Sequence, residues 1–137
     1  MNIFIDCEWN SFGGALISMA LCAESGEEFY EALWCPEPDP WVQENVMPIL
    51  NKPPVQYELF QLKLSKFLNQ FARIHIVADW AEDIKHFCDA LITGPGMCMN
   101  TPPLTMEVLR IDAQSKLPHN ALEDARAIRE AVLMMKS

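Results

Sequence analysis

Four acidic residues and one histidine are the residues of this chain best able to do chemistry, and each of their segments places a carboxylate where a core-facing residue would be expected. They are Asp6, Glu8, Asp83, His119 and Asp124, and they fall in three separate segments of the chain. A carboxylate that leaves water needs a strong partner, and a bound cation supplies one. Carboxylate oxygens are the ligands that Mg²⁺ and Mn²⁺ prefer in proteins. The three segments together therefore indicate a metal site.

The first two acids belong to a predicted strand, Asn2–Glu8, which is rich in apolar and β-branched residues. Side chains alternate between the faces of a strand, so Asp6 and Glu8 share one face and Ile3, Ile5 and Cys7 the other. A step of two residues spans roughly 7 Å, which the two side chains can close around one ion. The alternative is that both acids lie in water near the end of an edge strand.

The last acid belongs to a predicted helix, Ala121–Met135. Asn120 followed by Glu123 is typical of a capping box at the start of a helix. Asp124 is the only charged member of the apolar stripe formed by Ala121, Ala125, Ile128, Val132 and Met135. Its place in the first turn suits an anion, because the helix dipole is positive there. His119 precedes the helix on a loop, either over the site or at the surface.

Two residues of the second segment, Asp79 and Asp83, are candidates for its metal-binding acid. An apolar run, 74–78, predicts a buried strand, and a helix is expected from about Trp80 until before Gly94. Its apolar stripe is expected to contain Trp80, Ile84, Phe87 and Leu91. Asp83 borders that stripe and is the preferred ligand, while Asp79 at the strand end is the rival.

In this order, the residues resemble the DEDDh branch of the DEDD 3′–5′ exonucleases, which includes oligoribonuclease, ribonuclease T and polymerase proofreading domains. The matching pattern is Asp-x-Glu on a first strand, a mid-chain Asp, and His-x4-Asp at a last helix, and it spans nearly the whole chain. The chain departs from the pattern in two motifs. Asp79 stands where many relatives carry asparagine, and Glu82 where many carry an aromatic residue. Relatives often have a threonine and a glycine soon after the first-motif Glu, where this chain has the run 9–14, WNSFGG. The chain is short for the family, closest to its compact bacterial exoribonucleases.

The resemblance implies metal binding by Asp6, Glu8, Asp83 and Asp124. It also implies that His119 acts as the general base of a two-metal phosphodiester hydrolysis with Mg²⁺ or Mn²⁺. In the family, residues just after the first-motif Glu contact the terminal nucleotide. Trp9, Asn10 and Phe12 occupy those places, and the two aromatic residues either stack on a base or pack against the third helix.

The remaining residues predict the architecture. We expect strands at 15–23 and 28–34, an irregular proline-rich stretch with a short helix near 41–50, and a helix at 57–71. The segment 97–116 is either a strand with a helix or a long loop. With the resemblance, this order predicts an α/β, ribonuclease H-like fold in one domain, 1–137. Its mixed sheet would have three antiparallel strands extended by parallel ones, with helices packed on it.

Composition limits the partners. The net charge is −9, and two divalent ions would add +4 to leave −5, so a long phosphate backbone would be repelled outside the site. We therefore expect short or single-stranded RNA 3′ ends as substrate, with DNA 3′ ends as the alternative. Arg126 and Arg129 are the basic residues expected nearest the site, although a solvated helix face is the simpler interpretation of both.

The five cysteines form no Cys-x2-Cys pair, and no stretch is apolar enough to span a membrane or to act as a secretory signal. A reducing cytoplasm is the expected location, with Cys7 and Cys22 as core residues. A second copy of the chain is a candidate partner, giving a homodimer. A non-catalytic nucleic-acid-binding module of the same fold is the remaining alternative.

Overall fold

A computed structural model describes all residues, Met1–Ser137. Its centre is a mixed six-stranded sheet in the order β4-β3-β2-β1-β5-β8. The strands are β1 (Asn2–Trp9), β2 (Leu16–Ala23), β3 (Glu28–Leu33), β4 (Pro54–Val55), β5 (Ile74–Ala78) and β8 (Leu104–Val108). The first three strands pair antiparallel, whereas β1–β5, β5–β8 and β3–β4 pair parallel. The expected α/β class and mixed sheet are confirmed.

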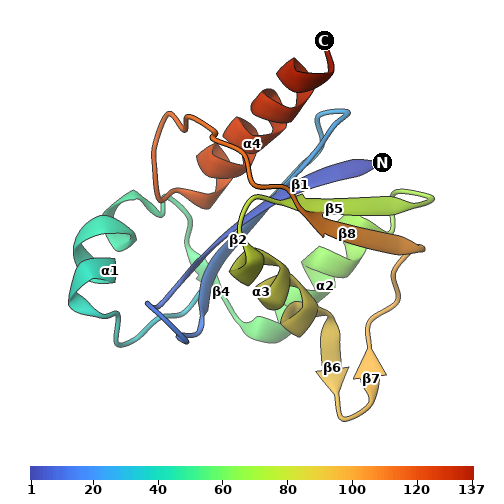
Figure 1. Ribbon diagram of the computed structural model, residues 1–137. Helices are drawn as coiled ribbons and strands as arrows, with labels where there is room; N and C mark the ends of the chain where they lie inside the picture. The colour runs from blue at the N-terminus through green and yellow to red at the C-terminus, as the bar shows by residue number, and fades with distance from the viewer.

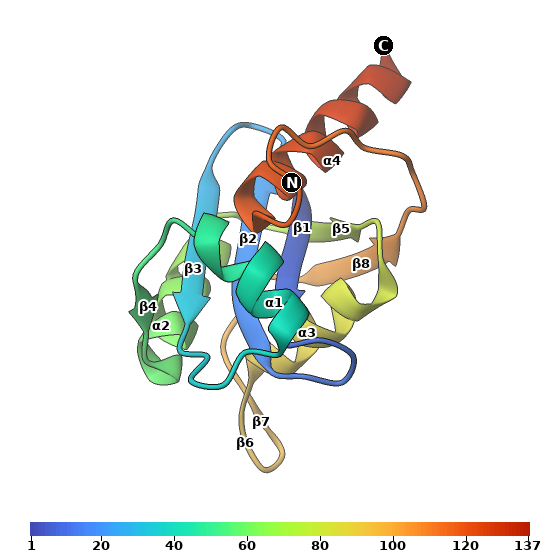
Figure 2. The same ribbon diagram turned by 90° about the vertical axis from the view of Figure 1, so that its left-hand side faces the viewer.

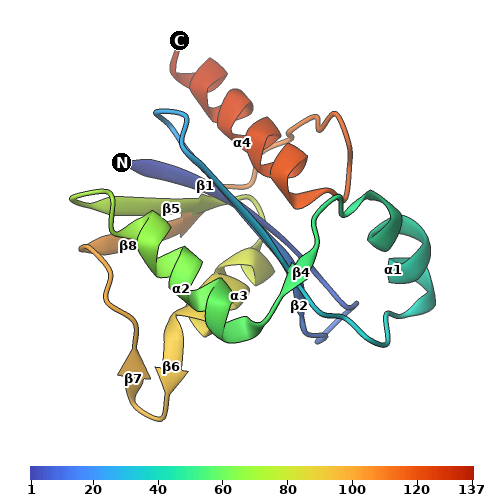
Figure 3. The same ribbon diagram turned by 180° about the vertical axis from the view of Figure 1, so that it is seen from behind.

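Helices cover both faces of the sheet (Figure 1). They are α1 (Pro40–Asn45), the short 3-10 helix η1 (Met47–Ile49), α2 (Tyr57–Leu68), α3 (Ala81–Leu91) and α4 (Ala121–Lys136). The helix α4 crosses one face, and α2 and α3 lie on the other, as the view from behind shows (Figure 3). The turned view shows α1 beside the N-terminal end of α4 (Figure 2). Packing on both faces is what allows β1 to be a central, buried strand.

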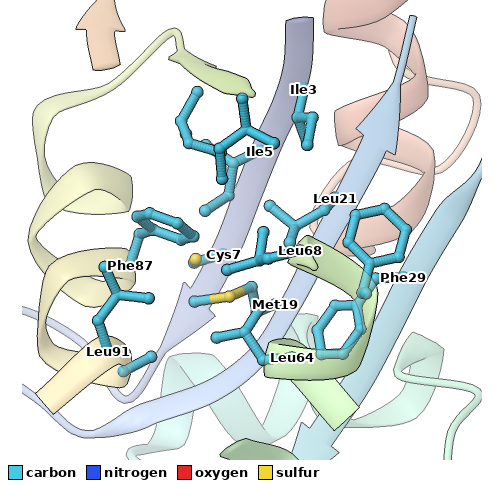
Figure 4. Packing of buried hydrophobic residues seen from close by; sticks show 14 of the residues in the cluster. Ile3, Ile5, Cys7, Met19, Leu21, Phe29, Leu64, Leu68, Phe87 and Leu91 are labelled. Carbon is cyan, nitrogen blue, oxygen red and sulfur yellow. The ribbon is translucent and has the colours of Figure 1, made fainter. Parts of the chain in front are cut away.

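The alternation predicted for β1 sets the two cores. Ile3, Ile5 and Cys7 point toward α2 and α3, where they meet Leu64, Leu68 and Phe87 among others (Figure 4). On the opposite face Phe4 packs with Val77, Ile128 and Val132 under α4. Asp6 and Glu8 share the face of Phe4, so both acids project beside α4 rather than into the main core.

Several element boundaries differ from those predicted. The helix expected at 41–50 is split into α1 and η1, and the helix expected to reach residue 71 ends at Leu68. Trp80 was expected in the apolar stripe of α3 but is the residue before the helix and is 47% exposed. Met135 was expected on the buried face of α4 but is 64% exposed, because the last turn of α4 extends past the sheet (Figure 1).

The segment left open at 97–116 contains two short strands and no helix. After α3, the short strands β6 (Ile92–Gly94) and β7 (Met97–Cys98) form a small hairpin that projects from the body (Figure 1). The strand β8 then extends the sheet, and residues 109–120 lead without regular structure to α4. None of the helices is both long enough and apolar enough to cross a membrane.

Candidate metal centre

The acidic residues meet at the carboxyl ends of two parallel strands. Asp6 and Glu8 lie in the second half of β1, and Asp79 directly follows β5. Asp83 and Asp124 each lie in the first turn of a helix, α3 and α4 respectively. Both helix N-termini are therefore directed toward the same end of the sheet, where their dipoles favour negative charge.

The carboxylates form two groups that share one residue. Asp6, Glu8 and Asp124 place oxygens within 4.8 Å of one another, and so do Asp6, Asp79 and Asp83. Either set of three could hold a metal ion, and the shared position of Asp6 would let one side chain serve two ions. Thus Asp83 and its rival Asp79 are not mutually exclusive, because both stand next to Asp6.

Two buried carboxylate oxygens of the cluster lack any partner. Asp83, which is 1% exposed, accepts a hydrogen bond from the backbone N–H of Cys7 through Oδ1 (3.0 Å), but its Oδ2 is buried and unpaired. The Oδ2 atom of Asp6 is likewise buried without a partner. An unpaired buried carboxylate oxygen is costly, and a hard divalent cation is the ligand that satisfies several at once. The donor set therefore fits Mg²⁺ or Mn²⁺.

The crowding also raises the pKa values of the cluster. Burial, followed by the charges of Asp124 and Asp83, raises the pKa of Glu8 from 4.5 to about 8. Burial raises the pKa of Asp83 from 3.8 to about 8, even though the N–H of Cys7 favours its charged form. For Asp6, burial and then the charges of Asp83 and Glu8 raise the pKa well above its usual value. At neutral pH the cluster holds protons that a cation would displace.

His119 lies at the edge of this cluster. Its backbone N–H donates to Oδ2 of Asp124 (3.1 Å), and its φ of 73° places it in the left-handed region that costs a non-glycine residue about 1–2 kcal/mol. The side chain borders a hollow of about 290 Å³ that is also lined by Asp6, Asp79 and Asp124. His119 therefore faces the same space as the carboxylates, on the loop predicted for it.

A second hollow, of about 250 Å³, adjoins the cluster through Glu8 and has aromatic walls. Trp9, Phe12 and Trp41 line it. Trp9 stacks on His86 with 5.0 Å between ring centroids, whereas Phe12 is 97% exposed at its tip. Of the predicted pair, Phe12 therefore reaches solvent beside Glu8, whereas Trp9 is half-buried and packs on His86 and against the main core.

Glycines shape the loop that carries Phe12. A Cβ added at Gly14 would stand 1.8 Å from the carbonyl oxygen of Asn10, so no other residue fits there. The Asn10 side chain is engaged in structure, since Nδ2 donates to the carbonyl of Glu37 (3.1 Å) and Oδ1 accepts from the N–H of Asp39 (2.8 Å). In this arrangement its amide ties the loop to the start of α1, and its predicted contact with substrate stays a prediction.

The predicted basic neighbours are occupied elsewhere. Arg126 forms ion pairs with Glu28 and Glu123, and Arg129 donates to backbone carbonyls of the turn after β2. The pairing of Arg126 with Glu123 also leaves the expected capping box half formed: Asn120 accepts from the N–H of Glu123 (3.0 Å), but the Glu123 carboxylate bonds to Arg126 instead.

Two residues near the cluster were not singled out from the sequence. Trp41 in α1 places its ring edge-on to His119, with 5.0 Å between centroids. Arg110 follows β8 and lies over the ring of Trp80, 4.8 Å from its centroid. Neither belongs to a recognisable motif, and only the packing of α1 and β8 brings them here.

No family model matches the chain, and no curated protein matches its sequence.

Proposed function

We propose that this chain is a metal-dependent 3′–5′ exonuclease of the DEDDh type that acts on short or single-stranded RNA. The observation that carries the proposal is the pair of carboxylate triads that share Asp6 and include two buried, unpaired oxygens. When bound there, two Mg²⁺ or Mn²⁺ ions would clamp the attacking and leaving oxygens of an in-line displacement at phosphorus. Asp6, Glu8, Asp83 and Asp124 would hold them, with Asp79 as a further ligand on the Asp83 side.

The strand arrangement supports the proposal. Three antiparallel strands, β3-β2-β1, are followed by the parallel strands β5 and β8, which is the order of a ribonuclease H-like sheet. In open α/β sheets the carboxyl ends of the parallel strands are the usual place for a site. Asp6, Glu8 and Asp79 stand there, and the helices α3 and α4 add their acids from the flanks.

The chain's own side chains divide the remaining work. His119, on the rim of the hollow with Asp124, is placed to accept the proton of the attacking water. Trp9, Phe12 and Trp41 surround the hollow next to Glu8, where a terminal base can stack. The aromatic walls recognise any base through its π face and give no preference between RNA and DNA. A 2′-hydroxyl contact would have to supply that preference.

The acidic surface supports a small substrate. With six of ten lysines and arginines engaged in ion pairs or backbone contacts, little free positive charge remains to follow a long backbone. A few nucleotides at a 3′ end would reach the site without that penalty. All five cysteines are free thiols, which supports the reducing cytoplasm proposed as its location.

The test is digestion of 5′-labelled RNA and DNA pentamers, single-stranded, with Mg²⁺, Mn²⁺ or EDTA. We expect RNA ladders that shorten from the 3′ end and disappear in EDTA. Asp6→Asn should abolish the ladders, while the matched control Asp89→Asn should keep them, because Asp89 is exposed and pairs only with Lys85. Internal cuts, or full activity in EDTA, would refute the proposal. Faster digestion of the DNA pentamer than of the RNA pentamer would show that DNA is the preferred substrate.

A further inference from the structure

We propose that Arg110, held on the ring of Trp80, is a phosphate-binding residue that positions the nucleic-acid backbone at the rim of the carboxylate cluster. The inference rests on the proposed function. Neither residue belongs to the set of acids and histidine that defines the site. Each comes from an element that ends beside the cluster: Trp80 from the turn into α3, and Arg110 from the chain just after β8.

The backbone fixes where Arg110 stands. The N–H of Leu109 donates to the carbonyl of Ala78 (2.7 Å), which continues the β5–β8 ladder by one step. Arg110 therefore lies beside Asp79 and Trp80, which come directly after Ala78. Asp79 itself lines the hollow with Asp6 and His119.

The guanidinium is oriented but unpaired. Its Cζ lies 4.8 Å from the centroid of the Trp80 ring, and Trp80 is 47% exposed, so the pair sits at the surface. No ion pair or hydrogen bond engages Arg110, although acidic residues are close. A guanidinium that lies over an aromatic face is held there by a cation–π contact, which uses none of its N–H donors in a hydrogen bond. The planar fork of these donors matches two oxygens of one phosphate and has no other partner here.

The other arginines do not serve this end of the sheet, and the unpaired Lys116 lines a neighbouring hollow with Glu123 and Arg126. Arg126 and Arg129 are held by Glu28, Glu123 and backbone carbonyls. Arg73, which is also exposed and unpaired, stands before β5, whereas Asp79 follows it, roughly 20 Å away at about 3.3 Å per residue. Arg110 is thus the arginine that a phosphodiester would meet next to the carboxylates, and Arg73 is a matched control.

The experiment compares wild type, Arg110→Ala, Arg110→Lys and Arg73→Ala with a labelled RNA pentamer. Turnover is measured in Mg²⁺ or Mn²⁺, and binding by anisotropy in Ca²⁺, over a range of salt concentrations. Loss of one charged phosphate contact should raise KM and Kd about 10- to 100-fold with kcat little changed. It should also reduce the slope of log Kd against log salt by about 0.7. Arg110→Lys keeps the charge without the planar fork and should recover only part of the affinity.

A substrate series makes the assignment specific. Pentamers carrying one neutral methylphosphonate at each linkage in turn remove one phosphate charge at a time. At one linkage, Arg110→Ala should cause no further loss, because its partner is already gone. Equal loss at every linkage, or kinetics of Arg110→Ala equal to those of Arg73→Ala, would overturn the inference while leaving the exonuclease intact.

The wild-type protein reports separately on the proposed function. If it binds RNA without cutting it and Arg110→Ala weakens that binding, exonuclease activity is refuted and the phosphate contact stands. If it neither binds nor cuts RNA or DNA, both proposals are refuted together.

Discussion

Replacing Asp6 by asparagine should stabilise the metal-free protein while removing its response to metal. Asp6 is the carboxylate common to both triads, and burial with the charges of Asp83 and Glu8 raises its pKa well above the usual value. In the absence of a cation its charge is a cost to folding. Asparagine keeps the shape of the side chain and removes the charge. The same change deletes the ligand that both proposed ions would share.

The geometry gives the size of the effect. Two unit charges at the 4.8 Å that bounds each triad repel by about 3.5 kcal/mol at an effective dielectric constant of 20, and by about 0.9 kcal/mol in bulk water. The cluster opens onto a hollow and lies between these limits. Asp6→Asn should therefore raise the free energy of unfolding by about 1–3 kcal/mol at pH 8 in EDTA.

The gain should depend on pH in a defined direction. The pKa of Glu8 and that of Asp83 rise to about 8 in the folded protein, so folding takes up protons. The metal-free wild type should then lose stability as pH rises from about 4 through 8, and the advantage of Asp6→Asn should be small at pH 5 and largest at pH 8. Divalent metal should stabilise the wild type most at pH 8, where it displaces these protons.

The assay is urea unfolding followed by circular dichroism at pH 5 and pH 8, each with EDTA, Mg²⁺ or Mn²⁺. Asp89→Asn is the control, because its side chain is 58% exposed and pairs only with Lys85. Its stability should change by a few tenths of a kcal/mol and its metal response not at all. A variant no more stable than wild type at pH 8, or a gain equal at both pH values, would refute the account of the cluster as crowded and partly protonated.

Three further outcomes are expected. Asp83→Asn should reduce both the stabilisation by metal and the turnover more than Asp79→Asn does, because Asp83 is 1% exposed and offers a buried oxygen without a partner. Calorimetry and kinetics measure the two effects, and the reverse order would make Asp79 the principal ligand. His119→Ala should keep the metal response while turnover falls about 10²- to 10⁴-fold; loss of metal binding would instead make it a ligand, and unchanged turnover would refute its role as base. Phe12→Ala removes an exposed ring and should raise KM for RNA about 5- to 150-fold with kcat unchanged, because a stacked base is worth about 1–3 kcal/mol. An unchanged KM would mean that Trp9 and Trp41 bind the base without Phe12.

Local patterns in the sequence carried much of the fold. The alternation along β1 placed Asp6 and Glu8 on the face opposite Ile3 and Ile5, because side-chain direction in a strand follows from its geometry. The start of α4 after Asn120 was also predictable from local sequence, since a cap satisfies N–H groups within four residues of it. The mixed α/β class followed from the order of such segments.

Contacts between distant segments decided the rest. The hydrophobic periodicity and capping residues of the sequence do not predict that Asp79 and Asp83 both lie beside Asp6. That arrangement depends on how β5 pairs with β1 and where α3 begins. The same holds for Arg126, whose charge is taken up by Glu28, 98 residues away along the chain. It holds for Arg110 over Trp80, which β8 brings there by pairing with β5.

The sequence by itself therefore determined which acids leave the apolar pattern and which helices and strands carry them. The tertiary structure decided that Asp6 is shared between two triads, that their buried oxygens lack partners, and which arginine remains free at the rim. The physical reason is range: propensity, periodicity and capping act within a few residues. Charge pairing, burial and the sharing of a ligand depend on elements that only the folded sheet brings together.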